Sequence, residues 1–118
     1  MTDFGFARQV RLIHKSDFDR VFSKAKRHSN RLFTILSRKN DEQPARLGLA
    51  VSKRVDKRAV KRNLIKRVIR ESFRVSKATV HGEDFIVIPK PIAAKASRGE
   101  LRTSLDGLWR RIGEQSKH

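Results

Sequence analysis

Residues 46–74, RLGLAVSKRVDKRAVKRNLIKRVIRESFR, have a pattern that predicts a short apolar strand, a basic connection and a long basic helix, around which the other elements pack. Eleven of its 29 residues are Lys or Arg, and only Asp56 and Glu71 are acidic. About a quarter of the chain therefore carries a net charge of +9, out of a formal +17 for the whole chain. Positive charge concentrated in one segment indicates a polyanionic partner, and nucleic acid is the first candidate.

The length and composition predict one domain over residues 1–118 with a single hydrophobic core. The absence of cysteine excludes disulfides and Cys-ligated zinc, and it fits a reducing compartment. No apolar run approaches the roughly 20 residues that span a bilayer. The first 18 residues also lack the uninterrupted apolar stretch of a secretory signal. We therefore expect a cytoplasmic protein with no membrane partner.

The long helix is predicted from about Arg58 to Ser76, because apolar and basic residues separate onto two sides at about 100° per residue. The apolar side comprises Val60, Leu64, Ile65, Val68 and Ile69, with Phe73 at its edge. The basic row comprises Arg62, Lys66, Arg70 and Arg74, flanked by Asn63 and Arg67. The apolar side needs a sheet to pack on.

On the N-terminal side of this stretch, we expect residues 1–15 to form a partly extended arm. A short helix is predicted from Ser16, as its N-cap, to near Lys24, with Phe18, Val21 and Phe22 at helical spacing. A polar connection and a strand near residues 30–38 follow. The turn-rich residues 39–44 then predict that this strand pairs antiparallel with the strand that begins at residue 47.

On the C-terminal side, a strand is predicted from Asp84 to Pro89. Ser97 and Glu100 have the spacing of a capping box, and they open a helix that we expect to end near Ile112, before a disordered tail over residues 113–118. The order helix, strand, strand, helix, strand, helix predicts an α+β or α/β fold, with helices packed on a small central sheet.

The chemistry of a protein active site is weakly represented in the sequence. None of the four histidines, His14, His28, His81 and His118, lies in a metal-binding spacing. The cluster of His81, Glu83 and Asp84 is explained more simply as a polar turn than as a cation site. No glycine-rich phosphate loop occurs. We therefore predict no catalytic residue and no metal ligand, and no small-molecule substrate.

The basic row favours nucleic-acid binding over a merely solvated surface, because Glu71 is the only acid between residues 58 and 74. Phe18 and Phe22 are core residues by default. If one of them is exposed, stacking on a base would contribute about 1–3 kcal/mol. We assign Phe85 and Trp109 to the core.

The segment VSKRVDKRAVKRNLIKRVIRESFR resembles the signature of the bacterial ribonuclease P protein subunit: Val-Ser-Lys-Lys, a short spacer, Arg-Asn-Arg-x-Lys-Arg and Arg-Glu. The segments RLIHKSDFDRVF, RLGLAVSK, DFIVIPK and LWRRI follow the order expected of that family. The resemblance implies a small sheet with packed helices and a left-handed βαβ crossover through the basic helix. It also implies that the catalyst is an RNA that binds Mg²⁺, and that the protein binds this RNA and the single-stranded 5′ leader of precursor tRNA, assisting removal of the leader.

The resemblance also implies which residues do this. The expected RNA-binding set is Lys53, Arg54, Arg58, Lys61, Arg62, Asn63, Lys66, Arg67 and Arg70. The expected lining of the leader-binding cleft is Phe18, Phe22 and Phe33. Leu36 falls near a position where relatives often carry an aromatic residue, so the alignment of its strand is open. Leu64 stands at the third motif position, where the family usually has Arg, and we expect that one RNA contact to be absent or to be replaced by Lys61.

Two other classes of function stay open. A basic ribosomal or nucleoid-type protein shares the size and the charge, and it would bind nucleic acid without assisting cleavage. A protein-only nuclease would need a carboxylate cluster that binds a metal ion. Leader-dependent binding separates the first alternative from the ribonuclease P assignment, and cleavage by the protein alone would reveal the second.

Overall fold

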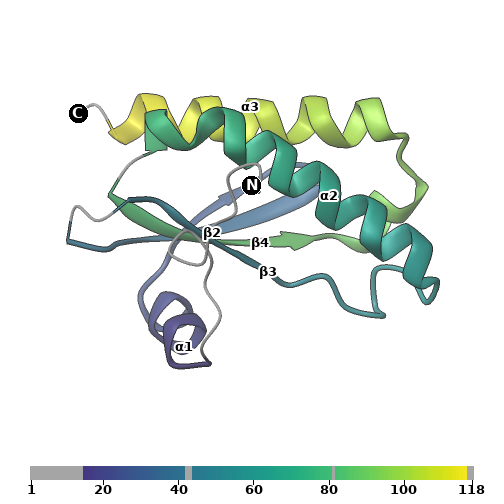
Figure 1. Ribbon diagram of the computed structural model, residues 1–118, viewed down its shortest axis with the longest axis horizontal. Coiled ribbons are helices and arrows are strands. Elements are labelled where there is room, and N and C mark those ends of the chain that lie inside the picture. Colours follow the sequence, from purple (N-terminus) through teal and green to yellow (C-terminus); the bar gives the residue numbers. More distant parts are fainter. Residues whose placement is uncertain (1–14, 42–43, 81, 117–118) are drawn as a thin grey trace, which may run out of the picture.

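The computed structural model describes residues 15–41, 44–80 and 82–116, which form an α+β fold with one four-stranded sheet (Figure 1). In chain order the elements are α1 (Lys15–Ser23), β1 (Lys26–Ser29), β2 (Phe33–Lys39), β3 (Arg46–Leu49), α2 (Ala59–Ser76), the 3₁₀ helix η2 (Lys77–Val80), β4 (Glu83–Pro89), the 3₁₀ helix η3 (Pro91–Lys95) and α3 (Arg98–Ser116). The predicted arm lies outside the described residues except for Lys15, which begins α1. Ser16 therefore lies within the first turn of α1 and is not its N-cap.

The strand order is β1-β2-β4-β3. The predicted antiparallel pairing of the strands before and after residues 39–44 is wrong, because β4 lies between them, antiparallel to β2 and parallel to β3. Phe85, Ile86 and Val87 of β4 are buried on both faces of the sheet, which is typical of a central strand. The sequence also missed β1, whose basic residues predicted a polar connection. Exposed charges of this kind are usual on an edge strand.

The parallel neighbours β3 and β4 are joined through α2, which crosses over the sheet (Figure 1). This crossover is left-handed, as the resemblance to the ribonuclease P protein family implied. The helix begins and ends where the sequence predicted it, with Arg58 as its N-cap residue. The predicted apolar side is correct except at Val60, which is 83% exposed because the first turn of α2 projects beyond the strands (Figure 1).

Helices α2 and α3 lie side by side over one face of the sheet, called the core face here (Figure 1). Three aromatic rings meet beneath them, with ring centroids 5.4 Å apart for Phe73 and Trp109 and 5.1 Å apart for Phe85 and Trp109. All three side chains are fully buried, which confirms the assignment of Phe85 and Trp109 to the core.

Helix α3 begins with the predicted capping box. The Ser97 backbone N–H donates to the Glu100 carboxylate over 2.8 Å, and the Glu100 backbone N–H donates to Ser97 Oγ over 3.1 Å. The tail predicted from residue 113 is wrong as far as Ser116, because α3 continues to that residue. Gly113 is buried against Thr79 of η2, and a Cβ added at Gly113 would lie 3.3 Å from the Thr79 carbonyl oxygen. Packing of Gly113 against η2 therefore explains why α3 continues beyond Ile112, the last apolar residue of its periodic pattern.

The short helix α1 packs on the opposite face of the sheet, called the α1 face here (Figure 1). The apolar residues of this small cluster are Phe18, Val21, Ala25, Leu36, Ala50, Ile86 and Ile88. Arg38 of β2 fixes the end of α1, because its guanidinium donates to the Arg20 carbonyl over 2.6 Å. Among the described helices, none is long and apolar enough to cross a membrane.

Candidate nucleic-acid interface

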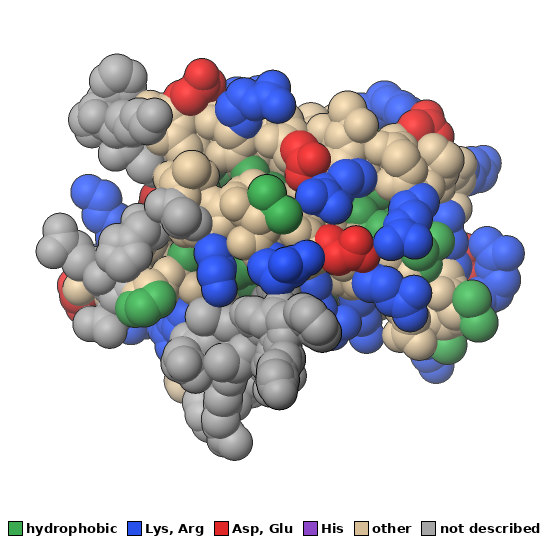
Figure 2. Space-filling view, turned by 45° about the horizontal axis from the view of Figure 1, so that its top comes forward, with side chains coloured by type: hydrophobic (Ala, Val, Ile, Leu, Met, Phe, Trp, Pro, Cys, Tyr) green, Lys and Arg blue, Asp and Glu red, His purple; other side chains and the backbone are tan. Residues whose placement is uncertain are grey.

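The predicted RNA-binding residues lie together on the turn between β3 and α2 and on the first three turns of α2. We call them the basic surface: Lys53, Arg54, Arg58, Lys61, Arg62, Asn63, Lys66, Arg67 and Arg70. Figure 2 shows Lys and Arg side chains gathered along the centre and right of the face that carries the helices, with fewer Asp and Glu side chains among them. Lys61, Arg62 and Lys66 are half-buried, and the other six are exposed.

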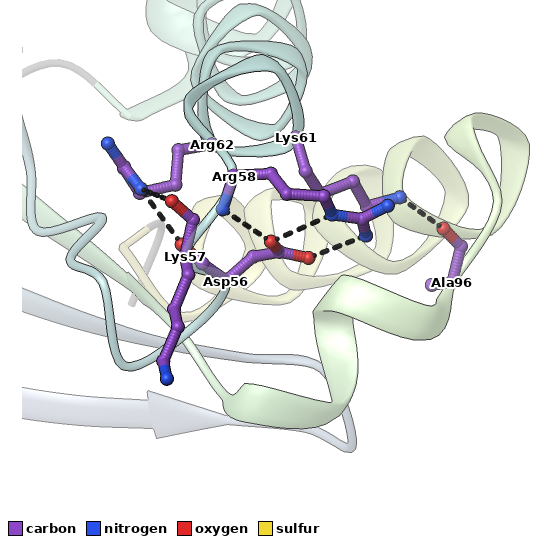
Figure 3. A network of polar contacts seen from close by, with 6 residues as sticks. All are labelled: Asp56, Lys57, Arg58, Lys61, Arg62 and Ala96. Carbon is purple, nitrogen blue, oxygen red and sulfur yellow. Dashed lines mark hydrogen bonds and ion pairs between the residues drawn. The ribbon is translucent and has the colours of Figure 1, made fainter.

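Arg58 is paired within the protein. Its backbone N–H and its Nε donate to Asp56 Oδ1 over 2.8 and 3.0 Å, and its Nη2 donates to Asp56 Oδ2 over 2.8 Å (Figure 3). The hydrogen bonds from the Arg58 side chain, and then the one from its backbone, lower the pKa of Asp56 to about 2. The carboxylate is therefore ionised at neutral pH and offsets the charge of Arg58.

Two further cations of the basic surface also bind protein atoms. Arg62 Nη1 donates to the carbonyl oxygens of Asp56 and Lys57 over 3.0 and 2.7 Å (Figure 3). Lys61 Nζ donates to the Ala96 carbonyl over 3.1 Å. We expected the RNA contact of the arginine that Leu64 replaces to be absent or to be made by Lys61, but the Lys61 ammonium group is directed at Ala96. Leu64 packs against the core, as its place on the apolar side predicted.

The other cations of the basic surface are not paired within the described structure. Within the described ranges, the side chains of Lys53, Arg54, Lys66, Arg67 and Arg70 form no hydrogen bond or ion pair. Arg67 and Arg70 are exposed and, with Asn63 and Arg74, follow one another at helical spacing along α2. Their Cα atoms advance about 1.5 Å per residue along the helix axis, so Arg67 and Arg74 lie roughly 10 Å apart along it. A basic stripe of this length can contact successive phosphates of a nucleic acid.

The aromatic residues predicted for the leader-binding cleft are not all on one surface. Phe22 of α1 is 50% exposed, and Phe18, one turn earlier, is half-buried in the cluster of the α1 face. The prediction for Phe33 is wrong, because Phe33 is 0% exposed and points into the core face. Side chains alternate along a strand, so Leu36 lies on the α1 face and Phe33 does not.

Arg27 is a candidate that the sequence missed, because β1 was not recognised as a strand. It is exposed and lies directly opposite Leu36 in the β1–β2 pairing, which places it on the α1 face with Phe22. Its neighbour Lys26 pairs with Ser37 and lies on the core face. The structure buries His28 between exposed neighbours, but KRHS contains no apolar residue, so this alternation gives no clear signal in the sequence.

Asp84, one of the three residues weighed as a cation site, serves the fold. Asp84 accepts a bidentate pair from Arg46, over 2.9 and 2.6 Å, and a hydrogen bond from Asn40 over 2.9 Å. His28 Nε2 lies 3.1 Å from Ser37 Oγ, and burial lowers its pKa. His14, His81 and His118 lie outside the described residues. In the part of the chain that the structure describes, no three His, Asp or Glu side chains are grouped as metal ligands.

Comparison with known proteins gives a single result. A family model described as Ribonuclease P matches residues 6–113. The chain is 41% identical over 115 residues to the ribonuclease P protein component of Aliivibrio fischeri, covering 98% of each chain. Among solved structures, the RNase P protein of Staphylococcus aureus matches with a TM-score of 0.80 at 35% identity, covering 86% of this chain and 94% of the other. That of Thermotoga maritima matches with a TM-score of 0.76 at 34% identity, covering 86% and 96%.

Proposed function

The chain belongs to the ribonuclease P protein family, whose members are protein components of an endoribonuclease that processes tRNA, and from this premise we propose how it contributes to the reaction. Its basic surface binds the catalytic RNA of the complex. The exposed aromatic side of α1 and the adjoining α1 face hold the single-stranded 5′ leader of precursor tRNA. The family assignment favours this function over a ribosomal or nucleoid role.

The observation that carries the proposal is the set of unpaired cations on the turn and on α2. A phosphate that meets Lys53, Arg54, Arg67 or Arg70 does not have to break an existing ion pair within the described structure. Each cation that neutralises a phosphate releases counterions, which favours binding strongly at low salt. Arginine adds a planar fork that can bind phosphate with two hydrogen bonds. The surface is therefore suited to the backbone of a folded RNA.

Leader binding needs a different chemistry, because the bases of a single strand are exposed. Phe22 offers a half-exposed ring on which a base of any identity can stack. In this proposal the protein positions RNA and supplies no reacting group. Hydrolysis of the phosphodiester at the 5′ end of the mature tRNA, and the Mg²⁺ that it requires, belong to the catalytic RNA.

The proposal is tested by the affinity of two Arg variants for a bacterial ribonuclease P RNA. Arg67→Ala removes an exposed cation of the basic surface, and Arg110→Ala removes an exposed cation of α3 outside it. We expect Arg67→Ala to weaken binding roughly tenfold, since it removes a charge-assisted contact, and to lower the slope of log K against log salt by about 1. Arg110→Ala should leave both nearly unchanged. If the two variants change the affinity and the salt slope equally, α2 is not specifically part of the RNA interface.

A further inference from the structure

The turn between β3 and α2 is fixed at two points. Val55 is 8% exposed and packs in the core, and its backbone N–H donates to the Ser52 carbonyl over 3.1 Å. One residue later, Asp56 receives three hydrogen bonds from Arg58 on its carboxylate and one from Arg62 on its carbonyl (Figure 3). The exposed residues Lys53 and Arg54 lie between Ser52 and these two fixed positions.

The Asp56 carboxylate performs two tasks at once. Its Oδ1 accepts the backbone N–H of Arg58, the N-cap residue of α2, and thereby sets how the chain enters the helix. The same carboxylate binds the Arg58 fork, while Arg62 ties the carbonyls of Asp56 and Lys57 to the second turn of α2. Arg58 and Arg62 of the basic surface thus hold the turn in shape, and this turn carries Lys53 and Arg54 of the same surface.

The charge of Asp56 acts against RNA binding. An acid on a surface that meets phosphates repels them, and Asp56 also offsets one of the arginines. If electrostatics alone mattered, removing the carboxylate would strengthen RNA binding. If the turn must be held in shape, removing it would weaken binding, because Lys53 and Arg54 would have to be ordered when the RNA binds. The two effects have opposite signs.

We propose that Asp56 is a positioning residue of the RNA-binding surface, which holds the turn of residues 52–58 so that Lys53 and Arg54 meet the RNA together. Arg62 belongs to the same arrangement, and its main role is to fix the carbonyls of Asp56 and Lys57. This inference rests on the proposed function, because it presupposes that the basic surface binds the catalytic RNA.

The test measures the affinity of four variants for a bacterial ribonuclease P RNA at several salt concentrations. Asp56→Ala removes both the charge and the acceptor. Asp56→Asn removes the charge but keeps an oxygen that can accept the Arg58 backbone N–H. Glu71→Ala is the matched control, because Glu71 is the other acid of this stretch and is ion-paired to Arg98, 3.0 Å away, outside the turn. Arg67→Ala reports on the proposed function itself.

We expect Asp56→Ala to weaken binding roughly tenfold and to lower the salt slope by about 1 to 2, as Lys53 and Arg54 lose their fixed positions. Asp56→Asn should recover part of that loss, and Glu71→Ala should bind as tightly as the unchanged protein or more tightly. If Asp56→Ala binds at least as tightly as Glu71→Ala while Arg67→Ala is weakened, the positioning role is wrong and the proposed function stands. If Arg67→Ala also binds the RNA with unchanged affinity, both the positioning role and the proposed function are wrong.

Discussion

The two faces of the sheet are built differently. On the core face, two long helices cover Phe33, Ile35, Phe85 and Val87, and the three-ring cluster around Trp109 is sealed from solvent. On the α1 face, one nine-residue helix covers a small cluster and leaves Phe22 half exposed, and Arg27 is exposed on the same face. Stability therefore rests mainly on the core face, while the α1 face keeps an exposed aromatic side chain that the proposed function assigns to leader binding. Four substitutions test this division of roles between the two faces.

The largest effect is expected for Trp109→Ala. The side chain is fully buried and contacts both Phe73 and Phe85, so its removal leaves a cavity in the main core. We expect a loss of about 3–5 kcal/mol in the free energy of unfolding, measured by urea denaturation. Trp109→Phe, which keeps an aromatic ring, should lose much less. A loss below about 1 kcal/mol for Trp109→Ala would show that the core face does not dominate stability.

Phe22→Ala should affect binding rather than folding. Loss of a stacking ring is expected to reduce the affinity for a precursor tRNA with a leader by about 1–3 kcal/mol, with little effect on mature tRNA. The measurement is binding of both RNAs to the reconstituted complex of protein and catalytic RNA. Equal losses for the two RNAs, or a drop in stability like that of Trp109→Ala, would return Phe22 to a purely structural role.

Two neighbouring residues on β1, one on each face of the sheet, allow the effect of position to be separated from the effect of charge, although the expected change is smaller. Arg27 lies on the α1 face, and Lys26, also exposed, lies on the core face. We expect Arg27→Ala to lower the salt slope of leader binding by about 1, because it removes one phosphate contact. Lys26→Ala removes the same charge and should leave the slope unchanged. Identical slopes for the two variants would show that the strand contributes only through its net charge.

The smallest effect concerns His28, which is buried at the edge of the core face. Burial, and then the charges of Lys26 and Arg111, lower its pKa below the usual 6.5, against an opposing effect of Glu83. A lowered pKa means that the unfolded chain binds the proton more readily, so the stability that His28 contributes is complete above pH 6.5 and declines as the pH falls below it. His28→Gln should flatten the stability between pH 7 and pH 5, measured by thermal unfolding. An unchanged pH dependence would mean that His28 does not titrate differently on folding.

Much of the fold could be predicted from periodicity. The bounds of α2, the strand β4 and the capping box of α3 follow from local patterns that the structure confirms. The sheet order could not be predicted this way, because the place of β4 between β2 and β3 depends on burial of its residues on both faces. The basic strand β1 and the continuation of α3 past Ile112 likewise depend on tertiary packing.

The candidate site was predicted as a set of residues but not as a set of interactions. Sequence patterns place Arg58, Arg62 and Arg67 on one basic segment and cannot tell them apart. The structure separates them, because Arg58 binds a carboxylate and Arg62 binds two carbonyls, whereas Arg67 is exposed. The error at Phe33 has a similar origin, since a shift of one residue along a strand moves a side chain to the opposite face.

The most direct test of the whole account is cleavage of a precursor tRNA by a bacterial ribonuclease P RNA at low Mg²⁺ concentration, with and without this protein. We expect strong stimulation that diminishes when the 5′ leader is shortened and when Phe22 is replaced by Ala. Tight but indiscriminate RNA binding without any stimulation would contradict it, and would favour a basic protein with no role in cleavage.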